Sequence, residues 1–422
     1  MCHAVTGATV SYSHGLASLA GVLISAGLAE DEIDLVTIRS NDVQHWTEEI
    51  LAKNPSMVLV SAMSNQWELV RELSLTLKRE SPRIPLCIGG AHAIASPSSL
   101  VDSAFDVVVS GEGEGVVVPL VTGGPTDIRS VTSRYHSMDW RQNFIRDLDE
   151  LPFPYLDIFE ISDILEYPSV MFSRGCPYKC TYCMSRKGGF SGNVRWKSPE
   201  RAICEVLQLL NYARPDEIFI DDDTLLKNPT WVERFCQLYS ESVEVPFYCN
   251  ARPETVSSKV VEFLRAANCA AIGIGIESGS SRLRRDVLQR EMSDEKILNA
   301  FSIAHKAGLK TWSFNMVGIP GETAEDLKLT IELNDRAETE FVRVSIFTPY
   351  PGTPIFEAFH TEPDYRGYIR SPKDLPTALL APYNDWLARL RLEGRLWFTE
   401  SEADLLVEPE TGLTREAMQS DG

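Results

Sequence analysis

Short apolar runs alternate with helical patterns along most of this 422-residue chain, and this alternation constrains the fold more than any other feature. In the first third, residues 67–80 have the apolar spacing of a helix, and residues 15–28 read as a helix closed by Gly27. The runs that read as buried strands are residues 32–38, 56–62, 84–90 and 105–111. Strands and helices in alternation predict a parallel, doubly wound sheet.

The alternation of strand-like and helical patterns is interrupted between residues 121 and 168, where turn-rich segments such as "ELPFPYLD" are typical of a linker. It then resumes with strand-like runs at 169–173, 217–221, 245–250, 270–277, 310–318 and 341–347. Helical patterns follow the first five of these runs. Six such units predict a barrel or partial barrel of parallel strands, with its catalytic groups on loops at the carboxyl ends of the strands.

Charge and composition narrow the classes of partner. The formal net charge of −20 repels phosphate backbones, so we expect no nucleic acid as a partner. No apolar run approaches the roughly 18 residues of a membrane span, and the N-terminus has no basic secretory region. We therefore expect a cytoplasmic protein without a membrane partner. Scattered thiols in such a protein are expected to be buried and inert: Cys2, Cys87, Cys204, Cys236, Cys249 and Cys269.

The remaining three cysteines share the short stretch "RGCPYKCTYC", directly after a predicted strand. A structural zinc site wants four ligands, usually as two separated pairs, and no second pair lies nearby. Three thiolates can hold three irons of a 4Fe-4S cluster and leave the fourth iron open for a ligand. The spacing of Cys176, Cys180 and Cys183 favours the cluster over zinc.

This motif, with the aromatic Tyr182 before its last cysteine, resembles that of the radical S-adenosylmethionine superfamily. The resemblance covers residues 169–354. It implies that the open iron binds S-adenosylmethionine, and that one electron from a donor such as flavodoxin or ferredoxin generates a 5′-deoxyadenosyl radical. A glycine-rich turn at 315–323 matches the family's fifth strand, and implies that Gly318 and Gly321 let the backbone approach an adenine.

The resemblance also implies further contacts to S-adenosylmethionine at the other strand ends. Asp221, Asp222 or Asp223 would receive the methionyl ammonium, although an acid cluster at a helix N-terminus is the alternative. Glu277 and Ser278 would contact the ribose or the carboxylate. Two arginines, Arg252 and Arg290, complete the set, and for Arg290 a plain solvated side chain remains the alternative.

The first domain resembles the cobalamin-binding domain that precedes many radical S-adenosylmethionine domains. Residues at its predicted strand ends would bind the cofactor: Ser61, Ser64, Gly89, Gly90, His92, Gly111 and Glu112. His92 is alternatively a hydrogen-bonding loop residue, and Glu112 and Glu114 alternatively cap the next helix, which is the preferred reading for Glu114. The Asp-x-His-x-x-Gly motif that supplies a histidine ligand to cobalt in other cobalamin proteins is absent, as it is from many radical enzymes with this domain. The usual first strand is missing or degenerate before residue 13.

Together these features predict an α/β protein. A doubly wound, Rossmann-like cobalamin-binding domain (1–122) is followed by a linker (123–168), a partial (β/α)6 radical barrel (169–354), and a C-terminal helical segment with a polar tail (355–422). The combination implies methylation of an unactivated carbon or phosphorus in a small molecule or natural product. A rearrangement, cyclisation or oxidation is the alternative within the same class, and a non-enzymatic iron–sulfur sensor is disfavoured.

Overall fold

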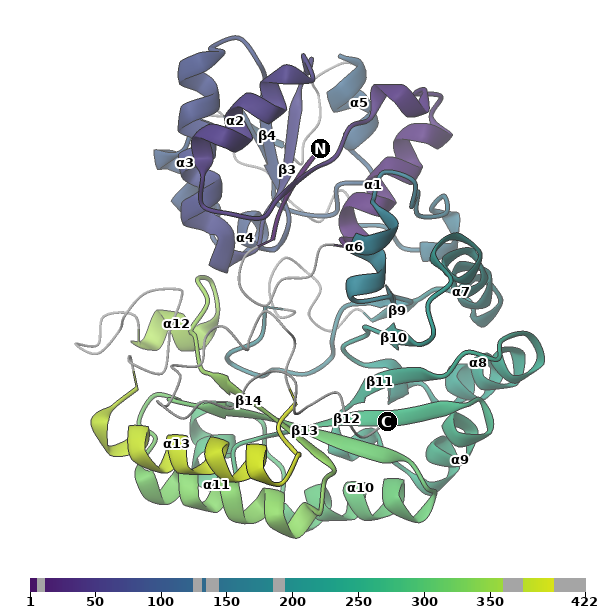
Figure 1. Ribbon diagram of the computed structural model, residues 1–422, viewed down its shortest axis with the longest axis vertical. Helices are drawn as coiled ribbons and strands as arrows, with labels where there is room; N and C mark the ends of the chain where they lie inside the picture. The colour runs from purple at the N-terminus through teal and green to yellow at the C-terminus, as the bar shows by residue number, and fades with distance from the viewer. Residues whose placement is uncertain (6–11, 124–130, 134–143, 185–193, 360–374, 398–422) are drawn as a thin grey trace.

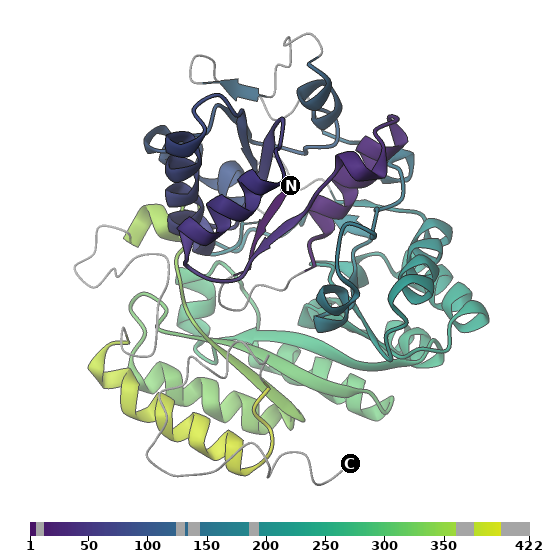
Figure 2. The same cartoon turned by 45° about the horizontal axis from the view of Figure 1, so that its top comes forward.

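The computed structural model describes residues 1–5, 12–123, 131–133, 144–184, 194–359 and 375–397, and it contains two six-stranded sheets (Figures 1 and 2). Each sheet has a hydrophobic core of its own. No helix in these ranges is long and apolar enough to cross a membrane. The predicted polar tail beyond residue 397 lies outside the described residues. The three boundaries between the four predicted segments stay a prediction.

The first sheet is doubly wound, as predicted. Its order is β2 (Val36–Ile38), β1 (Cys2–Ala4), β3 (Val58–Ser61), β4 (Leu86–Gly89), β5 (Val107–Val109) and β6 (Val131–Ser133), with only β6 antiparallel to its neighbour. Two pairs of helices cover its two faces (Figure 1). One pair is α1 (His14–Ser25) with α5 (Val117–Thr122), and the other is α2 (Val43–Ala52) with α3 (Trp67–Glu80).

The sequence predicts that the first strand is missing or degenerate; the strand is present, and it is degenerate in being only three residues long. β1 lies between β2 and β3, where Cys2 is paired with both Val36 and Val60. The strand has only three residues, one of them a histidine, so it gives no apolar run that a pattern could detect. β6 likewise lies within the segment that the sequence marks as a linker, although it adds a strand to the first sheet.

The second sheet is the predicted partial barrel. Its parallel strands run in the order β14 (Phe341–Ile346), β13 (Lys310–Val317), β12 (Cys269–Glu277), β11 (Phe247–Ala251), β10 (Ile218–Ile220) and β7 (Ser169–Val170). The edge strands β14 and β7 are not paired with each other, so the barrel stays open. The connecting helices are α7 (Pro199–Ala213), α8 (Pro229–Ser242), α9 (Ser258–Ala266), α10 (Asp294–Lys306) and α11 (Ala324–Ala337).

Local signals mark both ends of α10. The hydroxyl of Ser293 caps α10 by accepting a hydrogen bond from the backbone N–H of Lys296, and Gly308 follows the helix with φ of +75°. Five of the six scattered cysteines are buried, as expected. Cys204 is exposed instead, because it lies on the outer face of α7.

Shorter elements lie between the two sheets. They are α4 (Ala91–Ala95), α6 (Ile161–Glu166), α12 (Pro354–Phe359), and the antiparallel pair β8 (Ser173–Arg174) and β9 (Arg195–Trp196); a last helix, α13 (Thr377–Leu392), packs on α11. The N-terminal sheet stands above the barrel, with α12 beneath α4 (Figure 1). Gly352 lies so close to the end of α4 that an added β-carbon would be 2.0 Å from the carbonyl oxygen of Ala95.

Candidate active site

The three cysteines of the motif line one cavity at the carboxyl ends of β10, β11 and β12. The cavity has a volume of about 240 Å³, and its wall includes Cys176, Cys180 and Cys183. The loop is held in its middle by Thr181, whose N–H donates to the carbonyl oxygen of Leu288 at 3.0 Å. The loop presents its three thiols to one common cavity.

The chemistry of this wall fits an iron–sulfur cluster. Burial raises the pKa of the Cys176 thiol to about 11, so its thiolate form depends on positive charge nearby. Bound iron supplies such charge, and so does Arg252, which donates a hydrogen bond to the sulfur of Cys180 at 3.3 Å. Three thiols in one cavity with a cation beside them match the donor set that the sequence predicts.

The motif's Tyr182 lines the same cavity, together with three of the predicted contacts to S-adenosylmethionine: Arg252, Glu277 and Arg290. Arg290 is buried, so the solvated alternative is wrong. Its guanidinium donates to the carbonyl oxygen of Gly275 at 2.8 Å and lies 3.8 Å from the carboxylate of Glu277. Glu277 has a φ of +66°, a strained backbone conformation for a residue with a side chain, and such strain is common at functional sites.

Two of the predicted acids after β10 have different surroundings. Asp223 lines the cysteine cavity, whereas Asp222 is fully buried and accepts hydrogen bonds from the backbone N–H groups of Phe172 and Ser173 at 3.0 and 2.6 Å. The predicted role of Asp222 in receiving an ammonium is therefore replaced by a structural one. The alternative of an acid cluster at a helix N-terminus also fails for α8, which begins at Pro229 and has no acid in its first turn.

Three other predicted residues lie outside the described cavity walls. Ser278 is fully buried, and its hydroxyl accepts a hydrogen bond from the backbone N–H of Ser280 at 3.2 Å. The N–H of Gly318 donates to the carboxylate of Glu322 at 2.6 Å, and Gly321 in the same turn has a φ of +74°. The glycines shape the turn after β13, and their contact to an adenine stays a prediction.

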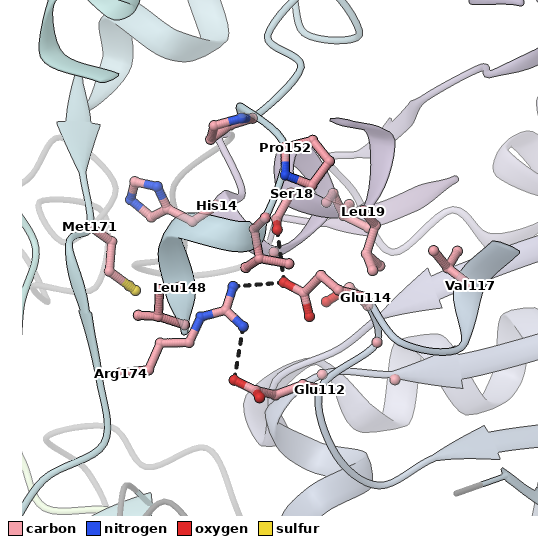
Figure 3. A pocket seen from close by; sticks show the side chains of 18 of the residues that line it. His14, Ser18, Leu19, Glu112, Glu114, Val117, Leu148, Pro152, Met171 and Arg174 are labelled. Carbon is pink, nitrogen blue, oxygen red and sulfur yellow. Dashed lines mark hydrogen bonds and ion pairs between the residues drawn. The ribbon is translucent and has the colours of Figure 1, made fainter. Parts of the chain in front are cut away.

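A second cavity of about 420 Å³ lies between the first sheet and the barrel (Figure 3). Its wall includes five of the predicted cobalamin-binding residues: Ser61, Gly89, Gly90, Gly111 and Glu112. Gly90 has a φ of +88°, and an added β-carbon would lie 2.8 Å from the carbonyl oxygen of Ala62 and 2.9 Å from the hydroxyl of Ser61. Only glycine fits this position at the carboxyl edge of the sheet.

An apolar slot extends this second cavity into the first domain. Its floor is the sheet face that α1 and α5 cover, and its walls are the inner sides of these helices. The slot is lined by Leu16, Leu19, Leu59, Cys87, Val109, Val117 and Leu120. A flat, apolar group suits such a slot, because the sheet and the helices enclose it from three sides.

His92 and Ser64 do not line either cavity. The imidazole of His92 is fully buried, stacks on the ring of Trp67 with 4.5 Å between centroids, and lies 3.1 Å from the hydroxyl of Ser64. The alternative of a hydrogen-bonding residue is therefore the one that the geometry supports. Burial lowers the pKa of His92 to about 4, so the ring is neutral near pH 7.

Arginines of the cysteine loop, which the sequence reading overlooked, meet the acids after β5. The prediction that Glu114 caps α5 is wrong, because the N-cap is Val116. Glu114 instead accepts hydrogen bonds from the hydroxyl of Ser18 at 2.7 Å and from Arg174 at 2.6 Å (Figure 3). Glu112 accepts from Arg174 at 2.8 Å and from Arg195 at 2.9 Å. The position of Arg174, two residues before the first motif cysteine, was the signal available in the sequence.

Comparisons with known protein families agree with these two sites. The radical SAM superfamily matches residues 170–333, and the B12 binding domain matches residues 4–121. The three thiols lie in the first match, and the slot between α1 and α5 lies in the second.

Individual relatives extend across both matches. The chain is 26% identical over 368 residues to an uncharacterized methyltransferase, PH0819, of Pyrococcus horikoshii, covering 81% of this chain and 77% of that one. It is 25% identical over 383 residues to the anaerobic magnesium-protoporphyrin IX monomethyl ester cyclase of Cereibacter sphaeroides, covering 84% of this chain. This chain spans 61% of the cyclase, which is less than two thirds of its length.

A solved structure shares the fold of both sheets. It is the radical S-adenosylmethionine methyltransferase TsrM of Kitasatospora setae, with tryptophan and an S-adenosylmethionine analogue bound, at a TM-score of 0.70 and 15% identity. The match covers 84% of this chain and 74% of that one. A second structure of TsrM, with cobalamin and a 4Fe-4S cluster bound, matches at a TM-score of 0.68 and 14% identity, covering 84% and 76%.

Proposed function

Because the chain is a radical S-adenosylmethionine enzyme that carries a B12-binding domain, we propose that it methylates an unactivated carbon or phosphorus of a small molecule. One observation carries the proposal. Asp223 lines both cavities, and the neighbours Gly175 and Cys176 line one cavity each. The two cavities therefore adjoin at the end of β10, and groups bound in them would face a common space where a substrate can lie.

The residues of the smaller cavity would hold the cluster and S-adenosylmethionine. Cys176, Cys180 and Cys183 would hold three irons of a 4Fe-4S cluster. Arg290, kept in place by the carbonyl oxygen of Gly275, presents a fixed cation to a carboxylate. The carboxylate of Asp223 offers an acceptor for an ammonium group. Bound in the two cavities, the cofactors supply hydrogen-atom abstraction and methyl transfer, which are chemistry that side chains cannot provide.

The larger cavity would hold cobalamin. Gly89 and Gly90 keep the carboxyl edge of the sheet free of side chains, so a broad ring system can lie against the backbone. The apolar slot between α1 and α5 is a place for the flat base of the cofactor's nucleotide tail. Leu148, Leu151 and Pro152 add an apolar wall from a segment that is hydrogen-bonded to α7, and such apolar cover excludes water from the reaction.

The substrate and the electron donor follow from the same proposal. We expect a small organic molecule or natural product as the substrate, and a flavodoxin or ferredoxin as the donor of the electron that reduces the cluster. The cyclase relative makes a non-methylating radical reaction the alternative outcome. The two outcomes differ in their products, because a methyl transfer through cobalamin also releases S-adenosylhomocysteine.

The test is anaerobic reconstitution of the full chain with iron, sulfide and hydroxocobalamin. The absorbance spectrum then reports the cluster and the bound corrinoid, and chromatography reports 5′-deoxyadenosine and S-adenosylhomocysteine after reduction. The S-adenosylmethionine carries a trideuteromethyl group. Formation of both products, with this label recovered in cobalamin, supports methylation. 5′-Deoxyadenosine without S-adenosylhomocysteine supports the alternative, and the absence of bound corrinoid removes the cobalamin part of the proposal.

Cysteine variants make this test specific. Replacing Cys176, Cys180 or Cys183 by alanine removes an iron ligand, and we expect 5′-deoxyadenosine formation to fall at least a hundredfold. Cys204→Ala is the matched control, because this thiol is exposed on α7 and lies apart from both cavities. Undiminished 5′-deoxyadenosine formation in the three motif variants would refute the proposal.

A further inference from the structure

The loop that carries the cysteines begins and ends at one short antiparallel pair of strands, β8 and β9. β8 ends at Arg174, β9 begins at Arg195, and these two residues are paired in the antiparallel register of the two strands. All three motif cysteines lie between them along the chain. Whatever holds Arg174 and Arg195 therefore holds both ends of the cysteine loop.

One carboxylate of the B12-binding domain holds both arginines. Glu112, in the turn after β5, accepts hydrogen bonds from Arg174 at 2.8 Å and from Arg195 at 2.9 and 3.0 Å. It also accepts from the backbone N–H of Ile145 at 2.6 Å. Glu114 binds the second amino group of Arg174 at 2.6 Å, so the first arginine is held by two acids at once.

Because the two carboxylates and Arg195 are buried, breaking the contact between the acids and the arginines is costly. The side chains of Glu112 and Glu114 are 4% and 6% exposed, and that of Arg195 is 9% exposed. Two acids and two arginines balance in charge, and a buried pair that loses one partner leaves an uncompensated charge out of water. The guanidinium planes must therefore stay in register with the carboxylates, and a shift of the turn after β5 moves the ends of the cysteine loop with it.

The same turn is part of the wall of the larger cavity. Gly111, Glu112, Gly113 and Glu114 all line this cavity, in which the proposed function places cobalamin. We infer that Glu112 is a positioning residue for the iron–sulfur site: from the B12-binding domain it fixes both ends of the cluster loop, so that occupation of the cobalamin site and of the cluster site is coupled. This inference rests on the proposed function only for the identity of the two ligands.

Coupling of this kind is reciprocal and can be measured by binding alone. The dissociation constant of hydroxocobalamin is determined by absorbance titration, once on cluster-free protein and once on anaerobically reconstituted protein. In the wild type we expect the cluster to tighten hydroxocobalamin binding about fivefold or more, which is the lower end of usual coupling. In Glu112→Gln, which keeps the shape of the side chain but loses its charge, we expect this ratio to fall below about twofold.

The control is Asp163→Asn. Asp163 is also a buried acid that contacts the first domain, because it pairs with Arg39, but it does not touch the cysteine loop. We expect it to keep the ratio of the wild type. Equal affinities in the two forms of the wild type would overturn the inference, as would an undiminished ratio in Glu112→Gln or an equal loss in Asp163→Asn.

A second variant and a spectroscopic readout guard against a folding defect. Glu112→Asp keeps the charge but is shorter by one methylene group, and we expect an intermediate ratio. Under excess dithionite, which also reduces the added hydroxocobalamin, the g values of the reduced cluster should shift when the cobalamin is added to the wild type and stay unchanged in Glu112→Gln. If the wild type transfers methyl groups but binds hydroxocobalamin equally well with and without the cluster, this inference fails while the proposed function stands.

Discussion

The guanidinium of Arg252 donates a hydrogen bond to the sulfur of Cys180 at 3.3 Å. Its carbon lies 3.7 Å above the centre of the Tyr178 ring, and its other edge pairs with Glu254 at 2.8 Å. The side chain is thus fixed on three sides and is only 12% exposed. A cation fixed at a ligating sulfur stabilises the additional negative charge of a reduced cluster more than the oxidised form.

Replacing Arg252 by glutamine should therefore make the cluster harder to reduce. We expect the midpoint potential to fall by tens of millivolts, while the three thiols still bind the cluster. A redox titration followed by electron paramagnetic resonance measures the potential directly. Arg285→Gln is the control, because that arginine is exposed and pairs with the neighbouring Asp286. An unchanged potential in Arg252→Gln would show that this hydrogen bond does not tune the cluster.

The order of strands and helices was predictable because apolar periodicity records it locally. The strand ends could have been read further with the same rule. Side chains alternate between the two faces of a strand, and continuing this alternation past the end of β10 places Asp222 and Asp223 on opposite faces. The structure shows this division: Asp223 lines the cysteine cavity, and Asp222 is buried. The rule does not extend to Ser278, because Glu277 ends β12 with a φ of +66° next to a register shift.

Other features depend on contacts that no local pattern contains. β1 is short and is stabilised by pairing with β2 and β3 on both sides rather than by a pattern of its own. The contact of Glu112 with Arg174 and Arg195 joins residues 62 and 83 positions apart, each of which looks like an ordinary charged residue in its own segment. Only the packing of the two sheets brings them together.

Glu322, which holds the turn after β13, should give the protein a measurable pH dependence. Burial raises its pKa from 4.5 to about 7, and its second carboxylate oxygen is buried without a partner among the described residues. The folded state thus favours the protonated form. The stability from this group is fully present below pH 4.5 and is lost as the pH rises through 7.

Glu322→Gln should remove this dependence, since an amide carries no charge at any of these pH values. Between pH 5 and 8 we expect the wild type to lose up to about 3 kcal/mol of unfolding free energy relative to the variant, at 1.36 kcal/mol per pKa unit. Urea unfolding at four pH values measures this difference. Glu325→Gln, an exposed acid in the next helix, should follow the wild type. Parallel pH profiles of wild type and Glu322→Gln would contradict the prediction.

Gly90 should be required for cobalamin binding but not for radical formation. An alanine there meets the backbone of Ala62 and the hydroxyl of Ser61 within 3 Å, at a φ that disfavours any side chain, so the edge of the sheet must shift. We expect the affinity for hydroxocobalamin to fall at least tenfold, which corresponds to about 1.4 kcal/mol. Gly27→Ala, with a φ of +99° and open space around it, is the control for backbone strain alone. Equal losses in both variants would mean that the cavity edge is not a binding surface.

Gly352 offers a test of how tightly the barrel is packed on the first domain. Its φ is +77°, and an added β-carbon would lie 2.0 Å from the carbonyl oxygen of Ala95 in α4. Strain from the positive φ alone costs an alanine about 1–2 kcal/mol, and Gly394→Ala, with a φ of +65° and nothing within 4 Å, measures this part. Because the clash comes in addition, we expect Gly352→Ala to lose at least about 1 kcal/mol more in urea unfolding and to expose the 349–354 segment to proteolysis. If the two variants unfold alike and are cleaved alike, α4 is free to move away from this loop, and the two cavities are not held at a fixed separation on this side of the molecule.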